Sequence, residues 1–140
     1  MTTDYAKFTE MLMDDIRTNG RPTQGPMAGR PLMVLTTKGA RTGQDREAVV
    51  TYTRDGDRYV IAASKSGAPT NPQWFYNIKA NPDVTVEAEG QKFNARATVT
   101  SGAERDRLWA QHAEERPEFR EYPNKTDRVI PMILLDRLTN

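Results

Sequence analysis

The segment PLMVLTTKGARTGQDREAVVTYTRDGDRYVIAAS, residues 31–64, contains three short apolar runs separated by turn residues. A connection with glycines and cations joins the first two runs, and Asp55-Gly56-Asp57 joins the last two. Short apolar runs bounded by such residues are typical of antiparallel strands joined by hairpins. The segment therefore predicts three consecutive antiparallel strands.

The rest of the chain continues the strand pattern and adds helices. Further strands are expected at VTVEAEG (84–90), KFNARATVT (92–100) and RVIPMILLD (128–136), with a hairpin turn at Glu89-Gly90-Gln91. Helical signals occur at DYAKFTEMLMDDIRTNG (4–20), NPQWFYNIKANP (71–82) and SGAERDRLWAQHAEE (101–115). Asn71 is expected to cap the second helix, and Ser101 with Glu104 to form a capping box on the third.

These elements fit one domain. A chain of 140 residues has the size of a single domain, and strands joined by short turns favour a small antiparallel barrel. The predicted fold class is mainly β (α+β): one domain over residues 1–140, with a barrel of about six antiparallel strands and helical insertions. Residues 1–29 are expected to form an N-terminal helix, packed on the domain, and an irregular lead-in.

Composition limits the functions that remain. The chain has no cysteine, no apolar stretch near the ~20 residues of a membrane span and no basic-then-apolar leader at its start. We therefore expect a cytoplasmic protein without a membrane span. The formal net charge is only +1, with seven cations against four acids from Arg30 to Lys65. This modest local excess suits a small anionic ligand better than nucleic acid.

The usual catalytic residues are scarce. His112 is the only histidine, it stands in a predicted helix among acids, and without cysteine it cannot complete a transition-metal site. We expect His112 to lie at the surface or half buried, and we expect no metal. The chain has no Gly-x-Ser-x-Gly elbow, and residues 39–43 lack the Lys-Ser/Thr of a phosphate loop. If the protein is an enzyme, a bound cofactor supplies the chemistry.

Two loops could hold such a cofactor. The first carries Lys38, Arg41 and Arg46, and the second, ASKSGAPTNPQWFYNIKANP (63–82), carries Lys65 ahead of a helix N-terminus and three adjacent aromatic residues. Taken alone, the first loop is more simply a solvated hairpin, and the aromatic residues are core packing with one ring outward. Together the loops predict a ligand that is anionic and partly aromatic.

Three motifs carry a family resemblance: VLTTKGARTGQDR (34–46), VIAASKSGAPTNPQWFYNIKANP (60–82) and KTDRVIPMILL (125–135). With these motifs in order, the chain from about Pro31 to its end resembles the deazaflavin-dependent nitroreductase family of the split β-barrel flavin-binding proteins. The resemblance implies a split β-barrel and coenzyme F420, an 8-hydroxy-5-deazaflavin with a ribityl-phosphate, a lactyl group and a glutamate tail. That coenzyme is a flat ring with an anionic tail, as the two loops predict.

The resemblance also implies site residues. The phosphate end would be held by Arg41, Thr42, Gly43 and Arg46, with Lys38 as a further cation. The deazaflavin would be bordered by Ser64 and Lys65, with Ala63 beside them, and Asn71, Trp74 and Asn77 would complete that wall. Phe119 and Tyr122, three residues apart in PEFREY, would share one face and line the substrate pocket. Tyr122 is the candidate catalytic proton donor or orienter, with bulk water as the alternative.

The implied activity is reduction by F420H2. A hydride would pass from the reduced deazaflavin to an activated alkene (an α,β-unsaturated carbonyl or lactone), a quinone or a nitroaromatic. The partner would be a small hydrophobic electron acceptor and not nucleic acid, with a monomer slightly favoured. Two alternatives stay open: an FMN- or haem-binding split barrel, and a barrel that binds single-stranded nucleic acid.

Overall fold

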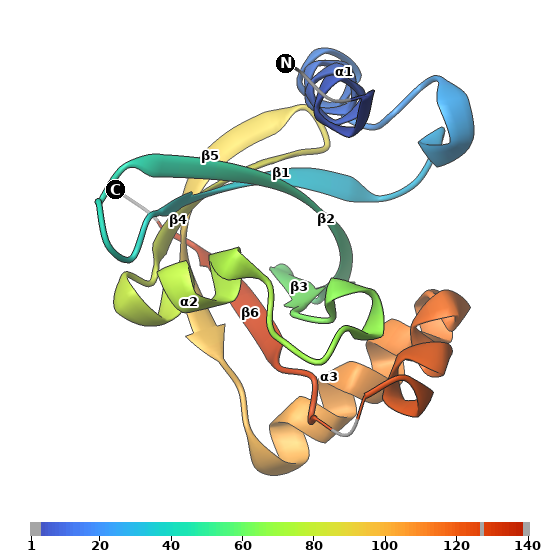
Figure 1. Ribbon diagram of the computed structural model, residues 1–140, viewed down its shortest axis with the longest axis vertical. Coiled ribbons are helices and arrows are strands. Elements are labelled where there is room, and N and C mark those ends of the chain that lie inside the picture. The colour runs from blue at the N-terminus through green and yellow to red at the C-terminus, as the bar shows by residue number, and fades with distance from the viewer. Residues whose placement is uncertain (1–3, 127, 139–140) are drawn as a thin grey trace.

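A closed barrel of six antiparallel strands forms the centre of the protein (Figure 1). The computed structural model describes residues 4–126 and 128–138, so residues 1–3 of the predicted lead-in, Asp127 of the third motif and residues 139–140 lie outside it. The strands follow the order β1-β2-β3-β6-β5-β4 around the barrel. Their bounds are β1 Leu32–Lys38, β2 Asp45–Asp55, β3 Arg58–Ala62, β4 Asp83–Ala88, β5 Gln91–Val99 and β6 Met132–Arg137. The predicted fold class and strand number are confirmed.

Two of the hairpins turn where the glycines stand. Asp55 pairs with Arg58 across a two-residue turn in which Gly56 has a φ of +62°. Glu89 and Gly90 connect β4 to β5 with φ values of +54° and +79°, which match the twist of paired strands. Positive φ costs glycine nothing because it has no Cβ. The sequence thus places these two turns correctly.

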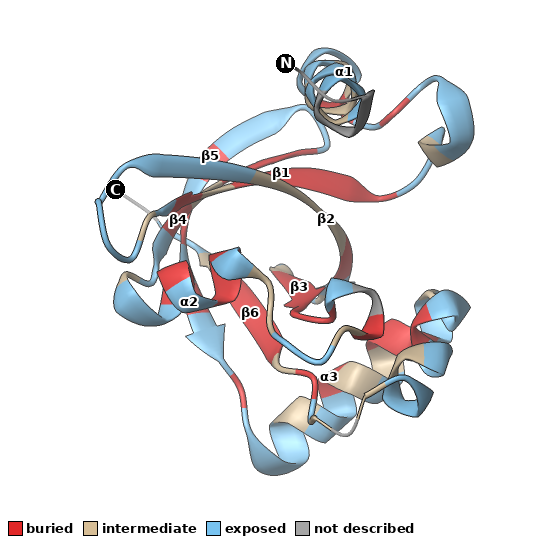
Figure 2. Ribbon diagram, in the orientation of Figure 1, coloured by how far each residue is buried: buried red, intermediate tan, exposed pale blue. Residues whose placement is uncertain are grey.

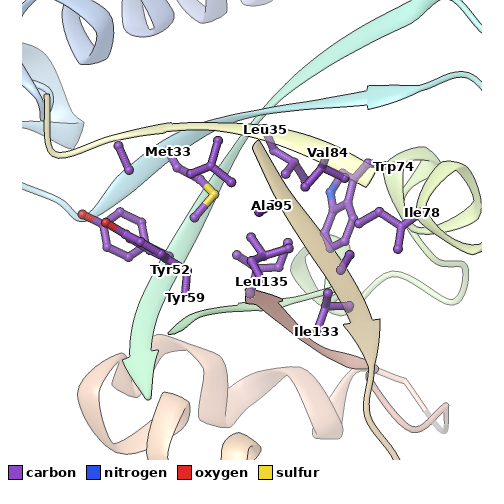
Figure 3. Close-up of a cluster of buried hydrophobic side chains, with 14 of the residues drawn as sticks. Met33, Leu35, Tyr52, Tyr59, Trp74, Ile78, Val84, Ala95, Ile133 and Leu135 are labelled. Carbon is purple, nitrogen blue, oxygen red and sulfur yellow. The ribbon is translucent and has the colours of Figure 1, made fainter. Parts of the chain in front are cut away.

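The barrel interior is filled by alternate residues of the strands and by one helix. Met33, Leu35, Ile133 and Leu135 point inward, as the two-residue period of a strand requires. Helix α2 (Gln73–Ala80) adds Trp74, which lies beside Val84 and Ile78 in Figure 3. The helix therefore closes part of the barrel interior with its own apolar face.

Two helical layers cover the outside of the barrel. Helix α1 (Asp4–Asn19) packs Leu12 and Ile16 against Leu32 and Val34 of β1, and Arg17 pairs with Glu87 of β4 and with Glu47 of β2. The expected packing of the N-terminal helix on the domain is confirmed. A short 3₁₀ segment, η1 (Gly25–Met27), follows in the lead-in.

The second layer lies on β3 and β6. Helix α3 (Gly102–Glu115) and the 3₁₀ segment η3 (Pro117–Asn124) cover the outward residues of these strands. Much of β3 and β6 is coloured as buried in Figure 2. A further 3₁₀ segment, η2 (Lys65–Gly67), follows β3 and lies next to η3. The two outer layers leave β2 between α1 on one side and η3 on the other.

Three local expectations are wrong. Helix α2 has Pro72, not Asn71, at its N-cap position, and the Asn71 side chain instead accepts a hydrogen bond from Arg128. Ser101 does stand at the N-cap of α3, but its hydroxyl caps none of the described backbone amides. His112 is fully buried, because it lies four residues after Leu108 on the helix face that meets the barrel.

Within residues 4–126 and 128–138, the structure has no helix long and apolar enough to span a membrane. The same residues contain no group of three His, Cys, Asp or Glu side chains placed to hold a metal ion.

Candidate functional site

 A hollow of about 790 Å³ lies beside Arg17 and Glu87. A separate cleft, which we call the first cleft, has a volume of about 670 Å³ and lies between the β1–β2 connection and helix α2. Its lining comes from both predicted loops: Gly39, Ala40, Arg41, Thr42, Arg46, Gln73, Tyr76 and Asn77. The structure thus brings four of the predicted cofactor-binding residues, Arg41, Thr42, Arg46 and Asn77, to one place.

Asn77 ties the first loop to helix α2. Its side-chain oxygen accepts a hydrogen bond from the Ala40 amide at 3.0 Å, and its side-chain nitrogen donates to the Thr37 hydroxyl at 3.0 Å. The side chain is 1% exposed, so both bonds are shielded from water. Since its polar atoms are held by the protein, Asn77 shapes the cleft wall and fixes the loop.

The cations of the first loop differ in their partners. Lys38 forms an ion pair with Asp45 at 2.5 Å and lies outside the lining of the first cleft. Arg41 and Arg46 line the cleft, and neither has an ion pair or a side-chain hydrogen bond among the residues that the structure describes. Two guanidinium groups therefore face the cleft without a counter-charge.

Strand β2 leads away from this cleft with one edge open. Its residues 45–51 pair with β1 and its residues 52–55 pair with β3, so no described strand pairs with the other edge of residues 45–51. Arg46, Ala48 and Val50 share one face of the strand. Ala48 and Val50 pack against the interior cluster and stay half-buried. This face offers a cation, then a flat apolar strip beside free backbone groups.

The second loop meets the expectations in part. Lys65 has a φ of +47°, unusual for a residue with a Cβ, and its ammonium reaches the Thr70 hydroxyl at 3.4 Å. Ala63, Ser64 and Trp74 are all buried, and Ala63 and Trp74 belong to the interior cluster. Tyr76, 44% exposed, is the one ring of the three that turns outward, as predicted.

Arg128 is a residue whose part in this region sequence reasoning missed. Its guanidinium donates to the carbonyl oxygens of Ala63, Ser64 and Ala68 and to the side-chain oxygen of Asn71, at 2.6–3.0 Å. Burial lowers the pKa of this guanidinium. The third motif contains Arg128, but the acceptors of Arg128 are mostly backbone carbonyls. Every residue has a backbone carbonyl, so the sequence does not indicate which ones Arg128 binds.

A second cleft, of about 560 Å³, lies between α1 and η3 and is lined by η1 and β2 as well. Phe119 and Tyr122 line it with a ring-centroid distance of 5.0 Å, so the predicted shared face is confirmed. Phe119 itself is buried. The opposite wall, which includes Phe8, Leu12 and Met27, was not predicted from the sequence.

His112 packs against Phe119, one of the residues that line this cleft. Its ring lies edge-on to Phe119 at a centroid distance of 4.5 Å, and its Nδ1 shares a hydrogen bond of 2.8 Å with the Thr53 hydroxyl. Burial lowers the pKa of His112 to about 4. The imidazole is therefore neutral near pH 7 and acts as packing under the Phe119 ring.

Comparison with known families decides what kind of protein has these two clefts. Residues 8–137 match the model of the F420H(2)-dependent quinone reductase family. The chain belongs to this family. As a member of the F420H2-dependent quinone reductases it is an oxidoreductase whose cofactor is coenzyme F420.

Individual relatives agree with the family. The F420H(2)-dependent quinone reductase Rv1261c of Mycobacterium tuberculosis is 39% identical over 123 residues, which cover 86% of this chain and 83% of the relative. A solved F420-H2 dependent reductase, FDR-A, is 35% identical with a TM-score of 0.71, over 76% of this chain and 95% of that one.

Two further solved structures bear on the fold and the assembly. One described as a domain-swapped dimer is 31% identical with a TM-score of 0.73, over 97% of this chain and all of that one. The heme storage protein HutZ of Vibrio cholerae is 16% identical with a TM-score of 0.61, over 80% of this chain and 84% of that one. HutZ shares the fold alone. The split-barrel architecture implied by the resemblance is thus confirmed.

Proposed function

We propose that the protein reduces quinones with F420H2 bound along β2. One observation carries this proposal: strand β2 reaches both clefts, because Arg46 lines the first and the residues that follow it, Glu47, Ala48, Val49 and Thr51, line the second. From Arg46 to Val50 the strand spans about 14 Å at about 3.4 Å per residue. A ligand with an anionic tail and a flat ring fits a strip that is cationic at one end and apolar along its length.

The phosphate end fits the first cleft. Arg41 and Arg46 offer guanidinium groups that no described carboxylate neutralises, and such groups bind phosphate oxygens in pairs of hydrogen bonds. Thr42 and Gly43 would complete the binding with a hydroxyl and a backbone amide. Lys38 has the smaller part, since Asp45 already holds its ammonium.

The ring fits between the open edge of β2 and the second loop. Ser64 and Lys65 would meet the edge of the deazaflavin, with Ala63 beside them. Asn71, Trp74 and Asn77 would support this wall from behind, because protein atoms already surround their side chains. Free backbone groups of β2 would then bond the edge of the ring, as a planar ligand in an apolar slot requires.

The acceptor fits the second cleft, where Phe119 and Tyr122 form one wall. The reduced coenzyme, when bound, supplies a hydride to an electrophilic carbon of the acceptor. The chain orients the acceptor and keeps water out with apolar side chains. Quinones are the first acceptors that we propose, and activated alkenes and nitroaromatics are further ones.

Tyr122 is the group we propose to deliver the proton that the reduced acceptor needs. It is partly exposed, it lines the second cleft, and its ring is held by Phe119 on one side and by the Lys125 ammonium at 5.7 Å on the other. A phenol fixed at the cleft wall is placed to donate a hydrogen bond to an acceptor oxygen. Bulk water is the competing donor.

We also propose that the protein works in the cytoplasm and as a monomer. The domain-swapped relative makes the assembly a matter for measurement, by light scattering on the eluate of a sizing column. A molar mass near 15.8 kDa is expected for the monomer, and twice that mass would contradict it.

Calorimetric titration tests the coenzyme assignment. We expect F420 to bind at least tenfold more tightly than FMN, a difference of about 1.4 kcal/mol, and we expect F420H2 to reduce a naphthoquinone in the presence of the protein. FMN binding as tight as F420 binding would overturn the assignment. Haem is the less suitable ligand because His112, the only histidine, is buried against Thr53.

A further inference from the structure

The guanidinium of Arg128 holds the irregular segment of residues 63–71, which we call the coenzyme loop. It donates to the Ala63 oxygen at 3.0 Å, the Ser64 oxygen at 2.6 Å, the Ala68 oxygen at 2.9 Å and the Asn71 side-chain oxygen at 2.8 Å. These acceptors span nearly the whole loop. One side chain from the far end of the sequence thus sets the path of the loop.

The loop has few hydrogen bonds of its own. The described backbone bonds within it are those from the Gly67 amide to the Ser64 oxygen at 2.9 Å and from the Ala68 amide to the Lys65 oxygen at 3.0 Å. Partly buried carbonyls need donors. The planar fork of an arginine can serve several at once, whereas a lysine ammonium cannot reproduce its geometry.

The loop also has a conformation that needs support. Lys65 has a φ of +47°, and Gly67 has a φ of +81° with Lys125 so close that an added Cβ would lie 2.9 Å from its Cβ. Left-handed backbone at a residue with a Cβ persists when its surroundings hold it. Lys125, which packs against Gly67, and Arg128, which donates hydrogen bonds to the loop, lie only three residues apart in the sequence.

We infer that Arg128 is a positioning residue for the coenzyme: its fork fixes the coenzyme loop, and the loop fixes the ring for hydride transfer. The inference rests on the proposed function for the second step and on the structure alone for the first. Loss of the fork frees the loop, and a ring displaced by about 1 Å can lower kcat roughly 10²-fold. Coenzyme affinity falls less, because Arg41 and Arg46 still hold the tail.

Hydrogen exchange without coenzyme tests the first step. We expect the amides of Gly67 and Ala68 to exchange at least tenfold faster in Arg128→Lys than in the parent. Arg105→Lys is the matched control, because Arg105 donates to the Ile130 oxygen at 3.0 Å and does not reach the loop. Equal exchange in Arg128→Lys and the parent would overturn the inference. Should Arg128→Lys not fold, Asn71→Ala removes one acceptor, and a several-fold increase is expected.

Rescue by a small molecule tests the second step. We expect Arg128→Ala to have a much lower kcat with F420H2 and a quinone, and guanidinium at tens of millimolar to restore part of it. Parental kcat in Arg128→Ala, or a lowered kcat that guanidinium leaves unchanged, would contradict the positioning role. A parent protein that neither binds nor uses F420 would refute the proposed function instead, and the exchange rates would still decide whether Arg128 holds the loop.

Discussion

Among single residues, charge pairing separates the cations of the first loop. Lys38 is paired with Asp45, whereas Arg41 and Arg46 face the first cleft with no described partner. A guanidinium that is already free of a carboxylate loses little when it binds a phosphate. The two arginines are therefore the cations on which coenzyme binding should depend.

Removal of these arginines should weaken the coenzyme complex and leave the fold intact. We expect Arg41→Ala and Arg46→Ala each to raise the Kd for F420 by about tenfold or more, since hydrogen bonds to charged groups contribute about 1.5–3 kcal/mol. Lys38→Ala is the control and should change the Kd far less. Calorimetric titration with F420 measures the Kd of each variant. A larger effect of Lys38→Ala than of the two arginine variants would contradict the assignment.

The hydroxyl of Tyr122 can be tested without disturbing its ring. We expect Tyr122→Phe to lower kcat by roughly 10²-fold, at the lower end of general acid catalysis, with the Kd for F420 unchanged. Steady-state kinetics with F420H2 and a quinone measures both. A kcat close to that of the parent would assign the proton to bulk water.

Of the structural elements, helix α3 carries a titratable group in the core. The pKa of His112 is about 4 in the folded protein because of burial, against 6.5 in the unfolded chain. Between these two values the unfolded state binds a proton that the folded state excludes. Stability from the neutral ring is thus fully present above pH 6.5 and is lost as the pH falls toward 4.

This pH dependence of stability leads to a prediction for His112 of α3. The free energy of unfolding should fall by about 2 kcal/mol between pH 7 and pH 5 through His112 alone. Because acids also titrate in this range, the useful quantity is the difference from His112→Gln, which should lack this part of the fall. Urea unfolding of the parent and of His112→Gln at pH 7 and pH 5 measures this difference. The same pH dependence in both proteins would show that His112 is not buried neutral.

The elements also show where local sequence signals suffice. The turns at Gly56 and Gly90 and the shared face of Phe119 and Tyr122 follow from neighbours within a few residues, and they were predicted correctly. Asn71 was predicted wrongly as a cap because Arg128, 57 residues further on, takes its oxygen. Burial of His112 likewise depends on Thr53, which no local pattern connects to α3.

For the whole molecule, the barrel and its helical layers determine where a coenzyme can lie. Helix α1 covers the outer side of β1, α3 and η3 cover β3 and β6, and β2 between them keeps one edge open. The family motifs predicted the two loops that we propose to hold the coenzyme. They could not reveal the second cleft, because its α1 wall comes from outside the motifs.

Mapping the bound coenzyme by amide chemical shifts tests this placement most directly. On titration with F420 we expect shifts at residues 39–46, at Ala48 and Val50 of β2, and through the coenzyme loop. Amides on the outer side of α1, such as that of Met11, should stay unchanged. Shifts confined to the hollow beside Arg17 and Glu87, with none at Arg41 or Ala48, would contradict the proposed site.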